Sequence, residues 1–380
     1  MSKSKLKSFH RPMRALGSCA LVFCLLAGSA WAEPWKFALL GDARGPKSGE
    51  GSTNGVRVSV LRPLAEDIAR QKVKLVLFSG DLASGGVKIG PLAVQWTAWR
   101  EAMAPLYQAG IAVYPCRGNH EIRKGATNEN TTAEWRAFLP DLPTNGPAGQ
   151  EGLTYRIDAP DATIIGVDEY AGRSKTFSGT NYDDVINFGM VSPWVVDEVY
   201  KATTPWVFVF SHEAAWMGHH TDGLVNAPAE RDALWDALGA KGGIYLAGHD
   251  HLYVRRTAPD SFRRPVLEIV AGCAGAPPYP YDHAALNARW DRHLVPTELF
   301  INASIAKDAK KDLTAARKPN TNGHPNYFGY VLFTIDGAKM TGEWRALTNY
   351  NLKKWKVEGT PEFSTLDTFS QESGRAKAAR

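Results

Sequence analysis

The chain has 380 residues, of which 44% are hydrophobic, and it carries 44 Lys and Arg against 39 Asp and Glu, a formal net charge of +5. This length exceeds that of a usual single domain, although large α/β enzymes reach it with insertions. Five of the basic residues and no acid lie before Ala15, so the rest of the chain is balanced. The charge therefore gives no reason to expect binding to nucleic acid.

The N-terminal segment, residues 1–32, has the three parts of a signal peptide. Its basic start is followed by an apolar stretch at 15–27 and by Ala30-Trp31-Ala32, a cleavage site that predicts a mature start at Glu33. The apolar stretch is too short for a membrane anchor, and no later run approaches spanning length. We expect an exported protein, periplasmic or extracellular, with no membrane anchor after signal cleavage.

Short apolar runs and amphipathic stretches alternate in the next part of the chain. Residues 37–40, 75–78 and 113–116 are apolar runs typical of strands buried on both faces. Residues 56–71 and 92–107 lie between these runs and have apolar side chains at helical spacing. The alternation predicts βαβ units around a central sheet.

The later part of the chain predicts a more varied set of elements. We expect helices at 132–138, 193–201 and 227–238, strands at 154–158 and 163–167, and a hairpin at 327–344. Residues 279–326 lack a clear period and form either an insertion near the site or a surface excursion. The polar tail, 358–380, is expected to be disordered, which leaves one folded domain at 33–357.

Five apolar runs end in a cluster of polar residues. Ligands of open α/β sheets bind beyond the carboxyl ends of the strands, so these clusters are expected to meet. Asp, Asn and His side chains are common metal ligands, and together they predict a dinuclear metal site. The clusters are Gly41-Asp42-Ala43-Arg44, Gly80-Asp81, Gly118-Asn119-His120-Glu121, Ser211-His212 and Gly248-His249-Asp250-His251.

In this order the clusters resemble the motifs of the calcineurin-like metallophosphoesterase superfamily, with the purple acid phosphatases as the nearest branch. The resemblance runs from Asp42 to His251 and implies a four-layer α/β/β/α sandwich. It also implies that two metal ions, of which manganese, iron or zinc are the expected kinds, hold a hydroxide that attacks phosphorus.

The same resemblance implies a role for each residue. Asp81 would bridge the two metals, and His120 would be the catalytic histidine that assists the leaving oxygen. Asp42 and His251 would hold the first metal, and the second would be held by Asn119, His212 and His249. Glu121 is expected to order its loop by hydrogen bonds, and Asp250 to point away from the metals. If the histidine motifs were absent, we would interpret Asp42 and Asp81 as caps of the helices that follow them.

Two positions depart from the family pattern. Family members have a histidine two residues after the first Asp or, in purple acid phosphatases, a tyrosine three residues after the bridging Asp. This chain has Arg44 and Ser84 there. Arg44 cannot ligate a metal, so it either contacts a phosphate or pairs with an acid. The first metal is accordingly expected to be the weaker one.

Other residues leave two readings open. His219 and His220 are either substrate-binding, as similar histidines are in purple acid phosphatases, or a solvated pair. Tyr279 either lines the entrance or packs. Cys116 and Cys273 either form a disulfide or remain two buried thiols.

The predicted function is an exported metal-dependent hydrolase of small-molecule phosphate esters. A monoester is the preferred substrate because an arginine beside the metals suits a dianionic phosphate. A phosphodiesterase or nucleotidase using the same site is the alternative. A second alternative belongs to a different functional class: a non-catalytic protein that binds a phospholigand and has one weakened metal site. The sequence leaves the oligomeric state open.

Overall fold

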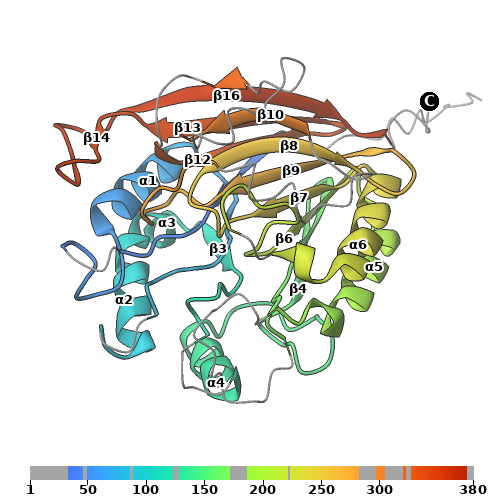
Figure 1. Cartoon of the computed structure of the whole chain (residues 1–380), viewed down its shortest axis with the longest axis horizontal. Coiled ribbons are helices and arrows are strands. Elements are labelled where there is room, and N and C mark those ends of the chain that lie inside the picture. The colour runs from blue at the N-terminus through green and yellow to red at the C-terminus, as the bar shows by residue number, and fades with distance from the viewer. Residues whose placement is uncertain are drawn as a thin grey trace, which may run out of the picture. The chain divides into compact units, whose positions relative to one another are not determined.

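Two large β-sheets with helices on their outer faces make up the computed structural model of the chain (Figure 1). The structure describes residues 33–374 except for 46–48, 86–88, 123–127, 172–185, 221–222, 282–296, 304–319 and 322–326. The predicted signal peptide lies outside the described residues, and residues 32–380 form one compact unit. Among the helices described, none has the length and apolar character needed to cross a membrane.

The first sheet has the strand order β16-β13-β12-β1-β2-β3. Its strands are β1 (Trp35–Leu40), β2 (Leu75–Phe78), β3 (Ala112–Pro115), β12 (Phe328–Asp336), β13 (Lys339–Leu347) and β16 (Phe363–Glu372). β1, β2 and β3 run parallel, and β12 pairs antiparallel with β1. The helices α1 (Val58–Arg70), α2 (Leu92–Ala102) and α3 (Ala104–Gln108) connect the parallel strands. The predicted βαβ alternation is therefore present.

The second sheet has the strand order β11-β10-β8-β9-β7-β6-β5-β4. Its strands are β4 (Tyr155–Ala159), β5 (Ala162–Gly166), β6 (Trp206–Phe210), β7 (Ile244–Ala247), β8 (Tyr253–Pro259), β9 (Pro265–Ala271), β10 (Thr297–Asn302) and β11 (Asn320–Thr321). β5, β6, β7 and β9 run parallel. The helices α5 (Ser192–Lys201) and α6 (Pro228–Lys241) pack on this sheet, and α4 (Asn128–Phe138) precedes it in the chain.

Aromatic side chains join the two sheets. The rings of Phe37 on β1 and Phe333 on β12 are stacked with centroids 4.5 Å apart. Phe208 on β6 meets Phe37 edge to face at 5.1 Å, so a residue of the second sheet completes the cluster. β1, β2, β6 and β7 are buried along almost their whole length, as strands between two covered faces must be. The predicted α/β/β/α sandwich is confirmed.

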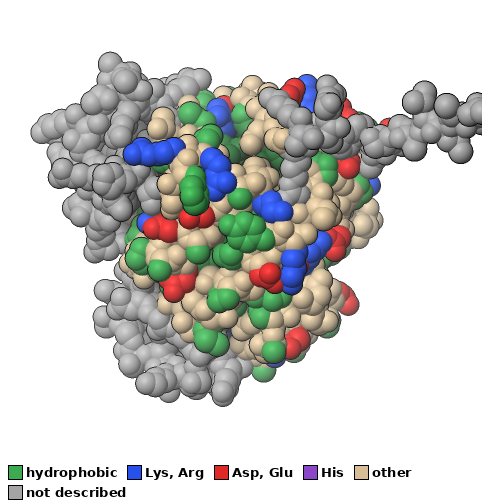
Figure 2. All heavy atoms as spheres, turned by 90° about the vertical axis from the view of Figure 1, so that its right-hand side faces the viewer, with side chains coloured by type: hydrophobic (Ala, Val, Ile, Leu, Met, Phe, Trp, Pro, Cys, Tyr) green, Lys and Arg blue, Asp and Glu red, His purple; other side chains and the backbone are tan. Residues whose placement is uncertain are grey.

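The outer face that carries α5 and α6 has side chains of mixed character. Acidic and basic side chains lie interspersed on it, with scattered apolar side chains between them (Figure 2). Two of the exposed apolar residues are Met190, in the 3-10 turn before α5, and Tyr200 in α5. This pattern is typical of a solvated helix layer.

The expectation of a disordered tail is wrong for residues 363–372, which form β16. β16 pairs with β13 from Lys339↔Glu372 to Leu347↔Phe363 and forms the edge of the first sheet. Asp367 on this strand accepts hydrogen bonds from the Arg255 guanidinium at 2.8 and 2.9 Å. Because β16 exposes much of its length, its sequence is polar, and its pairing comes from long-range contacts that a local reading cannot detect. Residues 375–380 lie outside the described part.

The two cysteines of the described chain are both buried and free. Burial raises the pKa of each thiol well above its usual range. Of the two alternatives left open by the sequence, the structure selects the buried thiols. The predicted hairpin is also present, because β12 and β13 pair directly up to Asp336↔Lys339.

Candidate metal centre

The predicted metal ligands meet where strands of both sheets end. Asp42, Asp81 and Asn119 come after β1, β2 and β3 of the first sheet, whereas the histidines come after β6 and β7 of the second. Every predicted ligand is buried. The ligands brought together are Asp42, Asp81, Asn119, His212, His249 and His251.

Several of these residues have a strained backbone. Asp42, Asp81 and His249 have φ angles of 63°, 53° and 64°, in the left-handed region that side chains with a Cβ disfavour. Such strain is kept only where the surrounding structure enforces it, and it clusters at functional sites. Close packing adds a second constraint, because a Cβ at Gly118 would lie 2.3 Å from Asp81 Oδ1. The glycines of the motifs therefore make room for the carboxylates.

One group of ligand atoms surrounds His212 Nε2. That nitrogen lies 3.1 Å from His249 Nδ1, 3.2 Å from Asn119 Oδ1 and 3.4 Å from Asp81 Oδ1. On the other side of the ring, Nδ1 is 2.7 Å from the Ser79 carbonyl, which accepts its proton and leaves the Nε2 lone pair facing the group. Atoms about 2.1 Å from a shared metal ion lie about 3.0–3.4 Å from one another. The group fits a single metal ion.

A second group of atoms lies beside Asp42. Its Oδ1 is buried, makes no hydrogen bond with any described residue and sits 3.6 Å from His251 Nε2. His251 Nδ1 lies 2.8 Å from the Pro277 carbonyl, which again leaves Nε2 as the lone-pair nitrogen. Burial, and then the charge of Asp81, raises the pKa of Asp42 well above its usual range. An unpartnered buried carboxylate oxygen is costly unless a cation meets it, so these residues fit a metal as well.

Asp81 lies between the two groups. Its burial acts to raise its pKa, but nearby His120, His212 and Arg44 outweigh that effect and the pKa is lowered. Ligand atoms of Asp81, Asp42 and His212 all lie within 4.8 Å of one another. This position between both groups suits the bridging role that the sequence predicts for Asp81.

Glu121 braces the loop beneath Asp81. Its Oε2 accepts hydrogen bonds from the backbone N–H of Gly118 at 2.7 Å and of Asp81 at 2.9 Å, and its Oε1 accepts from Leu82 N–H at 3.0 Å. Burial, and then the Asp81 charge, raises the pKa of Glu121 to about 8. The expectation that Glu121 orders the loop by hydrogen bonds agrees with these contacts.

A buried ion pair beside this loop was not found from the sequence. Arg117 Nη2 lies 2.5 Å from Asp168 Oδ2, and both side chains are almost completely buried. Asp168 follows β5 in the second sheet, whereas Arg117 precedes Asn119 in the first, so the pair joins the sheets next to the ligands. No motif marks Asp168, and only its place just after an apolar run could have drawn attention to it.

His120 lies at the edge of the cluster. Its Nε2 is 3.8 Å from Asp81 Oδ2, and its Nδ1 is 2.6 Å from the Ser84 carbonyl. The backbone N–H of His120 donates to Asp81 Oδ1 at 3.0 Å. Burial lowers the pKa of His120 to about 4, although Asp81 acts in the opposite direction. The side chain keeps 19% of its surface exposed, so one face of the imidazole is open to a ligand.

The two residues that depart from the family pattern make different contacts. Arg44 Nε lies 3.7 Å from Asp81 Oδ2, and Arg44 Nη2 donates to the Tyr279 hydroxyl at 3.1 Å. The hydroxyl of Ser84 donates to the carbonyls of Gly45 and Gly55, so it is not aimed at the centre. Only Arg44 of this pair therefore points toward the metal ligands.

His219 and His220 are brought to the centre by Asp250. The carboxylate of Asp250 accepts the backbone N–H groups of Gly218, His219 and His220, the last two at 3.0 Å. It thus points away from the metal ligands, as expected. The His220 ring stacks on His249 with centroids 4.0 Å apart. Both histidines are half-buried beside the predicted metal ligands, and their role in substrate binding stays a prediction.

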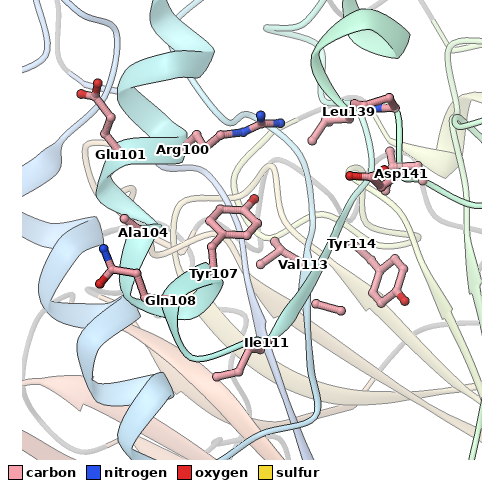
Figure 3. A pocket seen from close by; sticks show the side chains of 13 residues that line it. Arg100, Glu101, Ala104, Tyr107, Gln108, Ile111, Val113, Tyr114, Leu139 and Asp141 are labelled. Atoms are coloured by element: carbon pink, nitrogen blue, oxygen red, sulfur yellow. The ribbon is translucent and has the colours of Figure 1, made fainter.

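A separate cavity of about 700 Å³ lies along β3, beside α2, α3 and the end of α4 (Figure 3). Arg100 and Tyr107 face it from the helices, and Val113 and Tyr114 face it from the strand. None of the predicted site residues is among its lining residues. This cavity is therefore separate from the candidate metal centre.

Comparisons with known proteins agree with the geometry. A model of the calcineurin-like phosphoesterase family matches residues 38–253. A solved structure of PhoD is similar with a TM-score of 0.56 and 14% identity, over 91% of this chain and 71% of that one. A purple acid phosphatase from yellow lupin (Lupinus luteus) is similar with a TM-score of 0.54 and 14% identity, over 92% of this chain and 56% of that one. No curated protein matches the sequence.

The fold and the buried Asp, Asn and His cluster define a metal-dependent phosphoesterase. The chain belongs to the calcineurin-like phosphoesterase family. At 14% identity the structural neighbours establish the shared fold alone. What distinguishes this member must come from its own residues.

Proposed function

We propose that the protein is an exported hydrolase of small-molecule phosphate monoesters that holds two metal ions at this centre. The family supports metal-dependent hydrolysis of a phosphoester. The signal-like segment supports export, and Arg44 supports the monoester. The expected metals are manganese, iron or zinc, because mixed carboxylate, amide and imidazole ligands admit all three.

The two groups of atoms support one assignment of the ligands. Asn119, His212 and His249 would hold one metal, and Asp42 and His251 would hold the other, with Asp81 shared. When bound, such a pair polarises phosphoryl oxygens and lowers the pKa of coordinated water. The group around Asp42 has fewer protein ligands, so its metal should be the more weakly bound.

The observation that carries the monoester proposal is the position of Arg44. Its Nε is buried, has no hydrogen-bond partner among the described residues and lies on the Oδ2 side of Asp81. A guanidinium there adds a permanent positive charge and a free N–H where phosphate oxygens arrive. A monoester presents two negative charges to it and a diester only one, so the monoester gains more.

His120 is placed to handle the proton of the leaving alcohol. With its low pKa the imidazole is neutral at pH 7 in the absence of substrate. An arriving phosphate dianion raises that pKa, because its negative charge favours imidazolium. The Ser84 carbonyl holds the Nδ1 proton, so Nε2 is the atom that carries the exchanged proton.

The test is the rate on p-nitrophenyl phosphate and on bis(p-nitrophenyl) phosphate, with added Mn²⁺ and with chelator. We expect chelator-sensitive turnover that favours the monoester. Arg44→Gln should reduce that preference, and Arg62→Gln, which alters a surface ion pair, is the matched control. Faster diester turnover would assign a diesterase. No turnover with metal bound would favour the non-catalytic phospholigand-binding alternative.

Export has a separate test. We expect expression of the full chain in a bacterial host to place the protein in the periplasmic fraction with Glu33 as its first residue, by mass spectrometry. Recovery of an uncleaved chain in the cytoplasm would contradict the proposal.

A further inference from the structure

Tyr279 lies at the centre of the site's mouth, in a stack of three rings. Its ring is parallel to that of His251, with centroids 4.1 Å apart and an interplanar angle of 15°. On its other face it stacks on His219 at 4.3 Å and 14°. Its hydroxyl accepts a hydrogen bond from Arg44 Nη2 at 3.1 Å. One side chain thus contacts a metal ligand, a rim histidine and the arginine of the site.

These contacts distinguish Tyr279 from a packing residue. Tyr281, two positions later, is fully buried in the apolar core, whereas Tyr279 is half-buried. The ring neighbours of Tyr279 are His219, His220 and His251, all at the centre. An aromatic ring placed between two imidazoles fixes their planes without competing for their nitrogen atoms.

The backbone holds Tyr279 in place. Its N–H donates to the His251 carbonyl at 3.1 Å. The preceding segment is attached to the loop after β1, because Ala274 N–H and Ala276 N–H donate to the carbonyls of Gly41 and Asp42, each at 2.8 Å. The segment that carries Tyr279 is therefore hydrogen-bonded to the same backbone that carries Asp42 and His251.

We propose that Tyr279 is a positioning residue with two separable tasks: its ring fixes the metal ligand His251, and its hydroxyl aims the Arg44 guanidinium at the phosphate. The second task rests on the proposed function, whereas the first does not. Tyr279 thus couples the weaker metal site to phosphate binding.

Two substitutions separate the tasks. Tyr279→Phe keeps the ring and removes the hydroxyl, and Tyr279→Leu removes both. The readouts are the Mn²⁺ affinities of metal-free protein, by electron paramagnetic resonance of free Mn²⁺, and the dissociation constant of inorganic phosphate on Mn²⁺-loaded protein, by calorimetry. Neither readout requires turnover. KM for p-nitrophenyl phosphate is measured beside them.

We expect Tyr279→Phe to weaken phosphate binding and raise KM by about tenfold, the loss of one hydrogen bond that restrains a charged group, with Mn²⁺ affinity within about twofold. Tyr279→Leu should in addition weaken the lower-affinity Mn²⁺ site by about tenfold or more, as losing a contact that orients a ligand does. In an Arg44→Gln background, Tyr279→Phe should have no further effect, but Tyr279→Leu should still weaken Mn²⁺ binding. Tyr107→Phe, at the distant cavity, controls for loss of a hydroxyl.

Several results would overturn the proposal. The proposed role of the hydroxyl would be wrong if phosphate affinity were unchanged in Tyr279→Phe. It would also be wrong if Tyr279→Phe still weakened phosphate binding in the Arg44→Gln background. The proposed role of the ring would be wrong if Tyr279→Leu bound Mn²⁺ as tightly as wild type, or if the Phe and Leu variants lost the same amount of Mn²⁺ affinity. If wild-type protein hydrolyses neither ester, the proposed function fails, while the Mn²⁺ and phosphate measurements still decide the role of Tyr279.

Discussion

Replacing Glu121 by Gln tests whether the metal centre depends on a residue that is not a predicted metal ligand but holds the ligand loop by hydrogen bonds. The carboxylate of Glu121 accepts three backbone N–H groups, from Gly118, Asp81 and Leu82. A carboxamide has one acceptor oxygen, so its NH2 group must face at least one of these N–H groups. The arrangement of lowest cost keeps the amide oxygen of the new glutamine toward the N–H groups of Gly118 and Asp81. It leaves the N–H of Leu82 without an acceptor.

The magnitude follows from those contacts. A buried N–H without a partner costs about 1–3 kcal/mol, and the two remaining bonds lose the strength of a charged acceptor, about 1 kcal/mol together or more. We therefore expect Glu121→Gln to lower the free energy of unfolding by about 3 kcal/mol, a large share of the 5–15 kcal/mol typical of proteins. Because Asp81 N–H is one of the three, Mn²⁺ affinity should fall by about tenfold or more.

The assay is urea unfolding and Mn²⁺ binding at pH 8.5, above the pKa of about 8, where Glu121 is ionised. Glu151→Gln is the matched control, because Glu151 also accepts a backbone N–H, that of Gly149, but lies on the surface. The control should change stability by less than about 0.5 kcal/mol. If Glu121→Gln is as mild as the control in both measurements, the bracing role is wrong.

Three further outcomes are expected. His120→Ala should keep its Mn²⁺ content and lose about 10²–10⁴-fold in turnover, and loss of the metal instead would make His120 a ligand. Ending the chain at 357 should lower the unfolding midpoint by at least about 5 °C because β16 is lost, whereas ending it at 374 should not; similar midpoints would contradict the role of β16. The metal-free protein should lose stability between pH 6.5 and about 8. Glu121 and Glu169 have pKa values raised to about 8 and about 7, so the folded state binds more protons there than the unfolded state. His120 and His212, with pKa values of about 4, are neutral in the folded state, whereas in the unfolded state they are half protonated at pH 6.5, so they oppose this loss only in the lower part of the window. Mn²⁺ should reduce this loss, and urea midpoints at the two pH values, with chelator and with Mn²⁺, measure it; a rise in stability would refute the sign.

Much of the site could be predicted from the sequence because its chemistry is local. A short apolar run followed by glycine and an Asp or His describes a strand end with a ligand, and strand ends of α/β sheets gather ligands. The six metal ligands and His120 were named in this way, and the structure brings them together. Glu121 was also placed correctly, since its position in the third cluster ties it to the same loop.

The tail shows the limit of local reading. β16 has a polar sequence because it is an edge strand with much of its surface exposed, and the signals that make it a strand lie elsewhere. These are the register with β13 and the ion pair of Asp367 with Arg255, 112 residues away. The pattern of hydrophobic residues in a sequence indicates which residues are buried. A strand that is stabilised by backbone pairing and not by burial is therefore hard to detect from that pattern.

The sequence by itself determined the family, the layered fold and the predicted set of metal ligands, because strand ends and ligand types occur together in contiguous motifs. The tertiary structure decided what surrounds those ligands. It placed Tyr279 between His251 and His219, set Arg117 against Asp168, and turned Arg44 toward Asp81. These contacts join residues that are 28 to 60 positions apart, and the Arg117–Asp168 pair also joins the two sheets. Strand pairing within each sheet and the packing of the two sheets bring them within a few ångströms of one another.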